Sequence, residues 1–227
     1  MSRHFDNELC HLKAQLLFMA AAVESQLQDV VEALTTRHQE LAYQVMTNDH
    51  LVDQFDVEID ETCLALLALY KPTAGDLRFI TTTMKISGEL ERMSDLAVNI
   101  AERVVELNAE PQLKPYIDIT AMAKRSTGMV QDALEAFVNR DAALARRVCR
   151  CDQYMDDLTE QLFRELMSFM LEDPKTISRA TRLTFIGKYY ERIADHATNV
   201  AELVVYMVEG KIVRHLSSEY QSDQEFE

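Results

Sequence analysis

Two acidic segments, separated by a constant 100 residues, are the part of this sequence best suited to chemistry. Residues 91–102 read ERMSDLAVNIAE and residues 191–202 read ERIADHATNVAE, with seven of twelve positions identical. Each segment lacks Gly and Pro and is rich in helix-forming residues, so we expect a helix. Its polar oxygen-bearing side chains then recur one turn apart on one side, away from the local apolar face. They are Glu91, Asp95, Asn99 and Glu102 in the first copy and Glu191, Asp195, Asn199 and Glu202 in the second.

Carboxylates at this spacing have two interpretations. Their oxygens are hard ligands that suit Mg²⁺ or Mn²⁺, with iron or zinc as further candidates. Like charges one turn apart repel by about a few tenths of a kcal/mol. Their repetition therefore favours a compensating cation, which is either a metal ion or an arginine such as Arg92 or Arg192. The alternative is an ordinary solvated helix face.

A second pair of acids also occurs twice. Residues 56–60 read DVEID and residues 152–156 read DQYMD, at an offset of 96. If neighbouring helices pack antiparallel, these pairs approach the acidic segments: Asp56 and Asp60 approach Glu91 and Asp95, and Asp152 and Asp156 approach Glu191 and Asp195. The hypothesis is one carboxylate-rich metal site in each half, built across two helices at the bundle surface.

The elements that must position these acids are long helices. Apolar residues at spacings of three and four predict six of them, over residues 6–36, 38–69, 74–108 and 116–139, a fifth ending near 171, and 175–209. Prolines 111 and 115 mark a boundary, and Gly210 suits a left-handed helix end. We therefore expect an all-α fold of two tandem, similar antiparallel three-helix bundles, residues 1–110 and 111–210, followed by an acidic tail, residues 211–227.

Composition excludes several classes of protein. The formal net charge is −15, from 38 acids against 23 Lys and Arg, which argues against a nucleic-acid partner and favours cations and basic protein surfaces. The N-terminal residues lack the apolar core of a signal peptide, and no stretch approaches the length of a membrane span. Cys149 and Cys151 would diverge on a helix, so reduced thiols and a cytoplasmic location are expected.

The sequence offers no support for nucleophilic catalysis. It contains no GxSxG elbow, P-loop, HExxH or Gly-rich dinucleotide turn. A di-iron site of the bundle type needs two Glu-x-x-His elements, and here only Glu8 with His11 fits. His196 follows Asp195 and is either a ligand or a structural histidine. The chain is therefore expected not to be an enzyme, and a carboxylate-bridged metalloenzyme is the weaker alternative.

Several motifs together resemble the PhoU family, which regulates bacterial phosphate uptake and phosphate signalling. They are KPTAGDLR before the third helix, ELERMSD, its second copy within YYERIADHATNVAE, the paired DxxID-like elements and MLEDPKTI. The resemblance covers essentially residues 5–210, and motif order, duplication and spacing agree.

The resemblance implies a metal site in each half. By position, the metal-motif residues are Glu91 and Asp95 in one half and Glu191 and Asp195 in the other. Their plausible neighbours are Asp60, Asn99, Asp156 and Asn199. The second copy has His196 where the first has Leu96, so the two sites are expected to differ in metal preference.

The resemblance also implies a role. Family members are cytoplasmic, are often homodimers, and act as negative regulators of the phosphate-starvation (Pho) response. They are thought to link the ATPase subunit of the phosphate ABC transporter to a sensor histidine kinase. On this basis the chain is expected to be a metal-binding adaptor without catalytic activity. A metal-free helical scaffold is the alternative.

Overall fold

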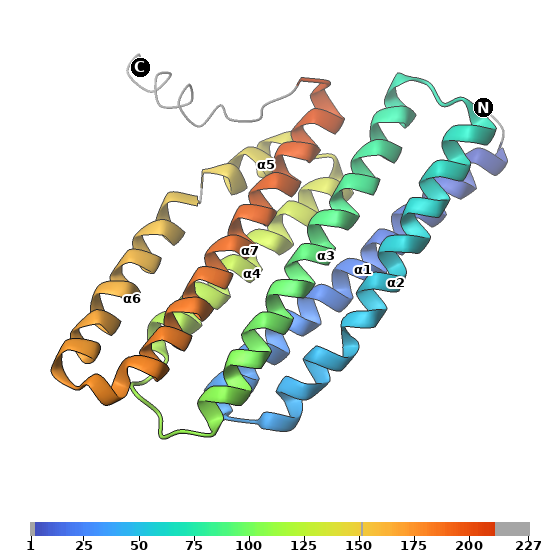
Figure 1. The fold of residues 1–227 in the computed structure, drawn as a ribbon. Coiled ribbons are helices and arrows are strands. Elements are labelled where there is room, and N and C mark those ends of the chain that lie inside the picture. Colours follow the sequence, from blue (N-terminus) through green and yellow to red (C-terminus); the bar gives the residue numbers. More distant parts are fainter. Residues whose placement is uncertain (1–2, 151, 212–227) are drawn as a thin grey trace, which may run out of the picture.

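The computed structural model describes residues 3–150 and 152–211, with the side chains of residues 3, 152 and 153 left out of the description. Within this part of the chain there are helices and connections but no strand, so the predicted all-α fold is confirmed (Figure 1). The elements are α1 (Arg3–Thr36), α2 (Gln39–Tyr70), α3 (Ala74–Asn108), α4 (Ile117–Asn139), α5 (Ala142–Cys149), α6 (Asp152–Glu172), the 3-10 turn η1 (Pro174–Thr176) and α7 (Ile177–Glu209).

The helices form because their apolar residues recur at helical spacing. On α3, buried side chains recur every seven residues: Phe79, Ile86, Met93, Ile100 and Leu107. Such a stripe gives each helix one face that must pack against a neighbour. The first half follows the prediction closely, with α1, α2 and α3 forming an antiparallel three-helix bundle joined by short connections.

The second half follows the same plan with one change. Its predicted middle helix is present as two consecutive helices, α5 and α6, separated near Arg150. Asp141 caps α5, because its carboxylate accepts hydrogen bonds from the backbone N–H groups of Ala143 and Leu144, each at 2.9 Å. The six-helix architecture holds, and α5 together with α6 takes the place that α2 has in the first half.

A buried lysine ties α6 to the segment that joins the two halves. The Lys114 ammonium lies 2.7 Å from Asp118 and also bonds Glu165 of α6. Its side chain is only 5% exposed, so these two carboxylates replace water around the charge. This pair of contacts fixes α6 against the start of α4.

The two halves pack against each other through equivalent helices. α3 and α7 lie side by side and antiparallel at the centre, while α2 and α6 lie at opposite edges (Figure 1). Arg78 donates to the Met207 carbonyl at 3.2 Å near one end, and Arg182 pairs with Glu106 at 2.6 Å near the other. The buried apolar residues form one continuous core across both halves.

The end of α7 matches its prediction. Gly210 adopts φ 72°, a left-handed conformation that glycine takes without strain, and its N–H bonds the Tyr206 carbonyl at 2.8 Å. Residues 212–227, most of the predicted acidic tail, lie outside the described residues. Among the residues described, no helix combines the length and apolarity that a membrane crossing requires.

Candidate metal-binding site

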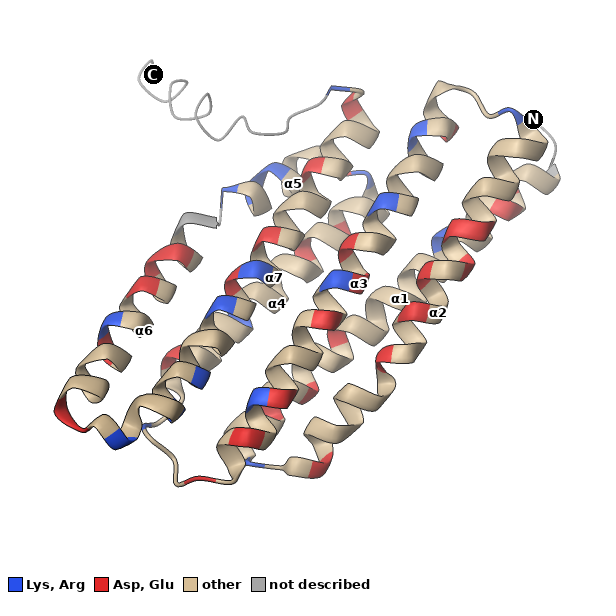
Figure 2. Cartoon of the chain, viewed as in Figure 1, with Lys and Arg blue, Asp and Glu red and all other residues tan. Residues whose placement is uncertain are grey.

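The first acidic face combines aspartates of α2 with the acidic motif of α3. Figure 2 shows acidic residues recurring along both helices. The α2 aspartates follow each other at spacings of four, three and four residues, so they share one side of the helix. They are Asp49, Asp53, Asp56 and Asp60.

The charges on these two helices act on each other. The pKa of Glu91 is raised by burial, and then by the carboxylates of Asp95, Asp56 and Asp53. The pKa of Asp95 is raised by burial, and then by Asp49 and Asp53. Two carboxyl groups of α3 thus respond to aspartates of α2, which means that the first face carries repulsion a bound cation would relieve.

A buried serine anchors one end of this face. Ser94 Oγ on α3 lies 2.6 Å from Asp49 Oδ1 on α2 and 2.6 Å from Gln26 Oε1 on α1. Ser94 and Gln26 are buried, so the contact connects all three helices of the bundle. Asp49 is thereby held toward α3 rather than left to extend into solvent.

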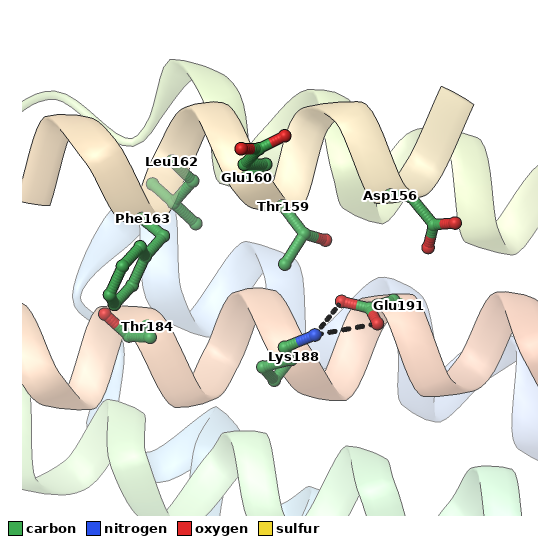
Figure 3. Close-up of a pocket in the computed structure, with 8 residues that line it drawn as sticks. All are labelled: Asp156, Thr159, Glu160, Leu162, Phe163, Thr184, Lys188 and Glu191. Atoms are coloured by element: carbon green, nitrogen blue, oxygen red, sulfur yellow. Dashed lines mark hydrogen bonds and ion pairs between the residues drawn. The ribbon is translucent and has the colours of Figure 1, made fainter. Parts of the chain in front are cut away.

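The second acidic face is smaller and contains its own cation. The pKa of Asp195 is raised by burial, and then by Glu191 and Asp156, while His196 and Lys188 act to lower it. Lys188 Nζ lies 2.8 and 2.7 Å from the two carboxylate oxygens of Glu191 (Figure 3). Part of the negative charge on this face is therefore already balanced by a lysine.

An open groove runs beside the second face, between α6 and α7. It has a volume of about 350 Å³. Figure 3 shows Asp156 and Glu191 at one end and the Phe163 ring near Thr184 at the other. The lining residues are Asp156, Thr159, Glu160, Leu162, Phe163, Thr184, Lys188 and Glu191.

The structure places one predicted aspartate of the neighbouring helix within electrostatic reach of each acidic motif. Asp56 acts on Glu91 in the first half, and Asp156 acts on Asp195 in the second, as antiparallel packing predicted. The charge that raises the pKa of Asp60, after burial, is that of Asp56 on its own helix. The side chain of Asp152 lies outside the description.

Two aspartates of the first face were not predicted from the sequence. Asp49 and Asp53 act on Asp95, and Asp53 also acts on Glu91. Their spacing from Asp56 continues the same helical period, and this is the signal that could have found them. Asp49 and Asp53 are not part of a repeated motif, because the second half has Ala145 and Cys149 at the offset of 96.

The two predicted asparagine neighbours have other contacts. The Asn99 amide donates to the Asp95 carbonyl of its own helix at 2.8 Å. The Asn199 amide donates to Glu89 of α3 at 3.0 Å, so this nitrogen serves the contact between the halves rather than the second acidic face. Sequence alone could not show this, because the packing of α3 on α7 was not predicted.

His196 makes a contact between the two halves, as a structural histidine would. Its Nδ1 lies 2.7 Å from Glu89 Oε2, and both side chains are largely buried between α3 and α7. Burial acts to raise the pKa of Glu89, but hydrogen bonds from His196 and Asn199 outweigh it and the pKa is lowered. His196 therefore joins the two halves.

The chemistry of both faces fits a hard divalent cation. Carboxylate oxygens are the preferred ligands of Mg²⁺ and Mn²⁺, and the pKa values of Glu91, Asp95 and Asp195 are raised by burial first and then by neighbouring carboxylates. Among the described side chains, however, no three His, Cys, Asp or Glu groups are gathered closely enough to hold a metal ion. Metal binding at these faces remains a prediction.

Comparison with known families supports the duplication. The PhoU domain model matches twice, over residues 16–104 and 119–204. The "Phosphate-specific transport system accessory protein PhoU homolog" of Aquifex aeolicus is 46% identical over 208 residues, covering 92% of this chain and 94% of that protein. The protein of the same name from Pseudomonas aeruginosa is 39% identical, covering 95% of this chain and 90% of that protein.

Solved structures agree with the fold. The crystal structure of PhoU from Pseudomonas aeruginosa superposes with a TM-score of 0.88 at 38% identity, covering 91% of this chain and 100% of that one. The phosphate transport system regulatory protein PhoU from Streptococcus pneumoniae gives a TM-score of 0.86 at 31% identity, with coverages of 92% and 99%. The chain therefore belongs to the PhoU family.

Proposed function

We propose that the chain is an accessory protein of phosphate transport and a negative regulator of the phosphate-starvation response. It acts in the cytoplasm, as a homodimer and without catalysis, as an adaptor between the ATPase subunit of the phosphate ABC transporter and the sensor histidine kinase. The observation that carries this proposal is the match of both halves to the family, with relatives named as phosphate-transport accessory proteins.

The acidic faces supply the metal part of the proposal. Asp53, Asp56, Glu91 and Asp95 would hold a divalent cation in the first half, and Asp156, Glu191 and Asp195 in the second. A bound cation would neutralise these carboxylates and join α2 to α3 and α6 to α7. The adaptor would then present two stiffened outer edges to its partners.

Deletion of the gene tests the regulatory role. Secreted or periplasmic phosphatase output in phosphate-replete cells is expected to rise on deletion and to fall again on complementation with the wild-type chain. Unchanged low output after deletion would refute the proposed role. A chain with Asp95→Asn and Asp195→Asn, expressed at the wild-type level, then shows whether repression requires the acidic faces.

A metal-free adaptor is the second candidate. It is favoured by one observation, namely that no three potential ligands are gathered among the described side chains. Calorimetric titration with Mn²⁺ separates the two candidates. Saturable binding that Asp95→Asn with Asp195→Asn abolishes supports the metal-binding adaptor, whereas equally weak binding by both proteins supports the metal-free one.

A further inference from the structure

α6 carries an outward stripe that begins in the second acidic face, at Asp156, and continues beyond it. The stripe recurs at spacings of four, three and four residues: Asp156, Glu160, Phe163 and Met167. Side chains at these spacings lie on one side of a helix. Phe163 and Met167 are each 43% exposed, although both are large and apolar. The stripe is thus acidic over its first two positions and apolar over its last two.

The facing side of α7 repeats this polarity along the groove. Thr184 lies near the Phe163 ring, and one turn further Lys188 is held by Glu191 opposite Asp156 (Figure 3). Asp195 extends the acidic end, since its pKa responds to Glu191 and Asp156. One end of the groove therefore presents apolar surface. At the other end Lys188 pairs with Glu191 and Arg164 pairs with Glu160, so the carboxylates of Asp156 and Asp195 make up the excess negative charge.

We propose that this groove is the docking site of a basic amphipathic helix from a partner protein. The helix would place Leu-like side chains against Phe163 of the groove and against Met167, which follows one turn later on α6, and Lys or Arg against Asp156, Glu160 and Glu191. The inference rests on the proposed adaptor function and names the chemistry of one partner. A basic partner is proposed because its charges complement the carboxylates of the groove. A helix is proposed because its side chains recur at the same spacing as those of the stripe.

Docking and cation binding at this end compete. Asp156 and Glu191 belong both to the groove and to the proposed second metal face. A basic helix would neutralise the same carboxylates that a divalent cation would. Mn²⁺ is therefore expected to weaken helix binding in the wild type. It should act only through the carboxylates, because Phe163 and Met167 at the apolar end offer no oxygen ligand for a cation.

The test uses the full chain and a labelled designed peptide of about 18 residues, enough for a helix that spans the groove. One face of the peptide carries Lys at one end and Leu at the other, and a peptide of identical composition with these positions scrambled is the control. Fluorescence anisotropy at low salt measures both. The wild-type chain is expected to bind the patterned peptide about tenfold more tightly than the scrambled one.

Two groove variants and one matched control locate the binding. Phe163→Gln with Met167→Gln, and separately Asp156→Asn with Glu160→Gln, are each expected to weaken binding about tenfold, as hot-spot contacts do. Leu64→Gln, at an exposed apolar position of α2 that is 60% exposed, is expected to leave it unchanged. Circular dichroism confirms that each variant keeps its helix content.

Each outcome decides the inference. Equal binding of patterned and scrambled peptides, or equal losses from Leu64→Gln and the groove variants, overturns it. If gene deletion raises phosphatase output and the Phe163→Gln, Met167→Gln chain restores repression fully, the groove inference fails while the proposed function stands. If deletion changes nothing, the proposed function fails, and the peptide measurements alone decide whether the groove binds a basic helix.

Discussion

The two acidic faces descend from one repeated motif, yet they differ in the helix that each motif faces. In the first half, α2 is continuous and brings four aspartates to one side, and Ser94 holds the first of them. In the second half, the equivalent helix is divided, and Ala194 stands where the first copy has Ser94. The acids of the motif are present on both α3 and α7. The number of further carboxylates that face them depends on the neighbouring helix, which is α2 in the first half and α6 in the second.

A lysine sharpens the difference between the faces. Lys188 pairs with Glu191 in the second half, and the position 100 residues earlier is Gly88, which has no side chain to offer. In the first face Arg92 acts on Glu91 but is hydrogen-bonded to Glu89, whereas in the second face Lys188 bonds a carboxylate of the face itself. The first face is therefore expected to have the greater need for an external cation.

Replacement of Lys114 should lower the stability of the protein. Lys114→Met leaves the carboxylates of Asp118 and Glu165 without their shared ammonium, so the free energy of unfolding should fall by about 2 kcal/mol. Denaturant unfolding followed by circular dichroism measures it. Arg164→Met, which breaks an exposed pair with Glu160, is the control and should cost less than about 0.5 kcal/mol. Equal losses would show that α6 does not depend on the buried tie.

Divalent cations should distinguish the two faces by affinity. Asp53→Asn with Asp95→Asn removes charges that act on each other across α2 and α3, and should weaken Mn²⁺ binding about tenfold. Asp156→Asn with Asp195→Asn should have a smaller effect, since Lys188 already balances part of that face. Calorimetric titration measures both. A larger loss from the second-half pair would reverse the proposed order.

Removal of the internal cation should make the second face more like the first. Lys188→Met frees Glu191 and should raise Mn²⁺ affinity there about threefold, the range of one exposed charge pair. Lys124→Met, at an exposed position on α4, removes the same charge elsewhere and should leave affinity unchanged. Equal gains from both variants would indicate a response to net charge alone.

The smallest expected effect concerns stability without metal. Asp95→Asn should stabilise the metal-free protein at pH 7 by about 0.5 kcal/mol, because it removes a partly buried charge and the repulsion of that charge with Asp49 and Asp53. The folded-state pKa of Asp95 is raised, so the wild type loses stability as pH rises through the window above the ordinary carboxyl pKa of 3.8. The advantage of the variant should vanish below that window, where wild-type Asp95 is protonated.

A thermal melt against pH in EDTA measures this effect, which corresponds to about 1–2 °C. Asp195→Asn should gain less, because His196 and Lys188 already act to lower the pKa of Asp195. Asp132→Asn, at an exposed position on α4, is the control for removal of a charge. A gain from Asp95→Asn that persists at low pH would show that charge repulsion is not its cause.

Much of the fold follows from local chemistry in the sequence. The helix predicted over residues 74–108 coincides with α3, because Pro72 precedes it, Asn108 ends it and Pro111 follows it, and Gly210 marked the end of α7. The break between α5 and α6 was not predicted, because residues 142–171 keep a helical apolar spacing throughout. The period of apolar residues shows which side of a helix faces a core, but it does not show where one helix ends and the next begins.

The duplicated all-α architecture and the acids of each motif could be predicted from the sequence, since helix period places Glu91 and Asp95 on one side whatever surrounds them. Which charges act across helices depends on how the helices pack, and this was visible only in the structure. Asp49 and Asp53 lie on the first face because α2 packs on α3. Asn199 and His196 contact Glu89 because α7 packs on α3. Contacts between helices depend on how whole faces pack, which spacing along one helix does not encode.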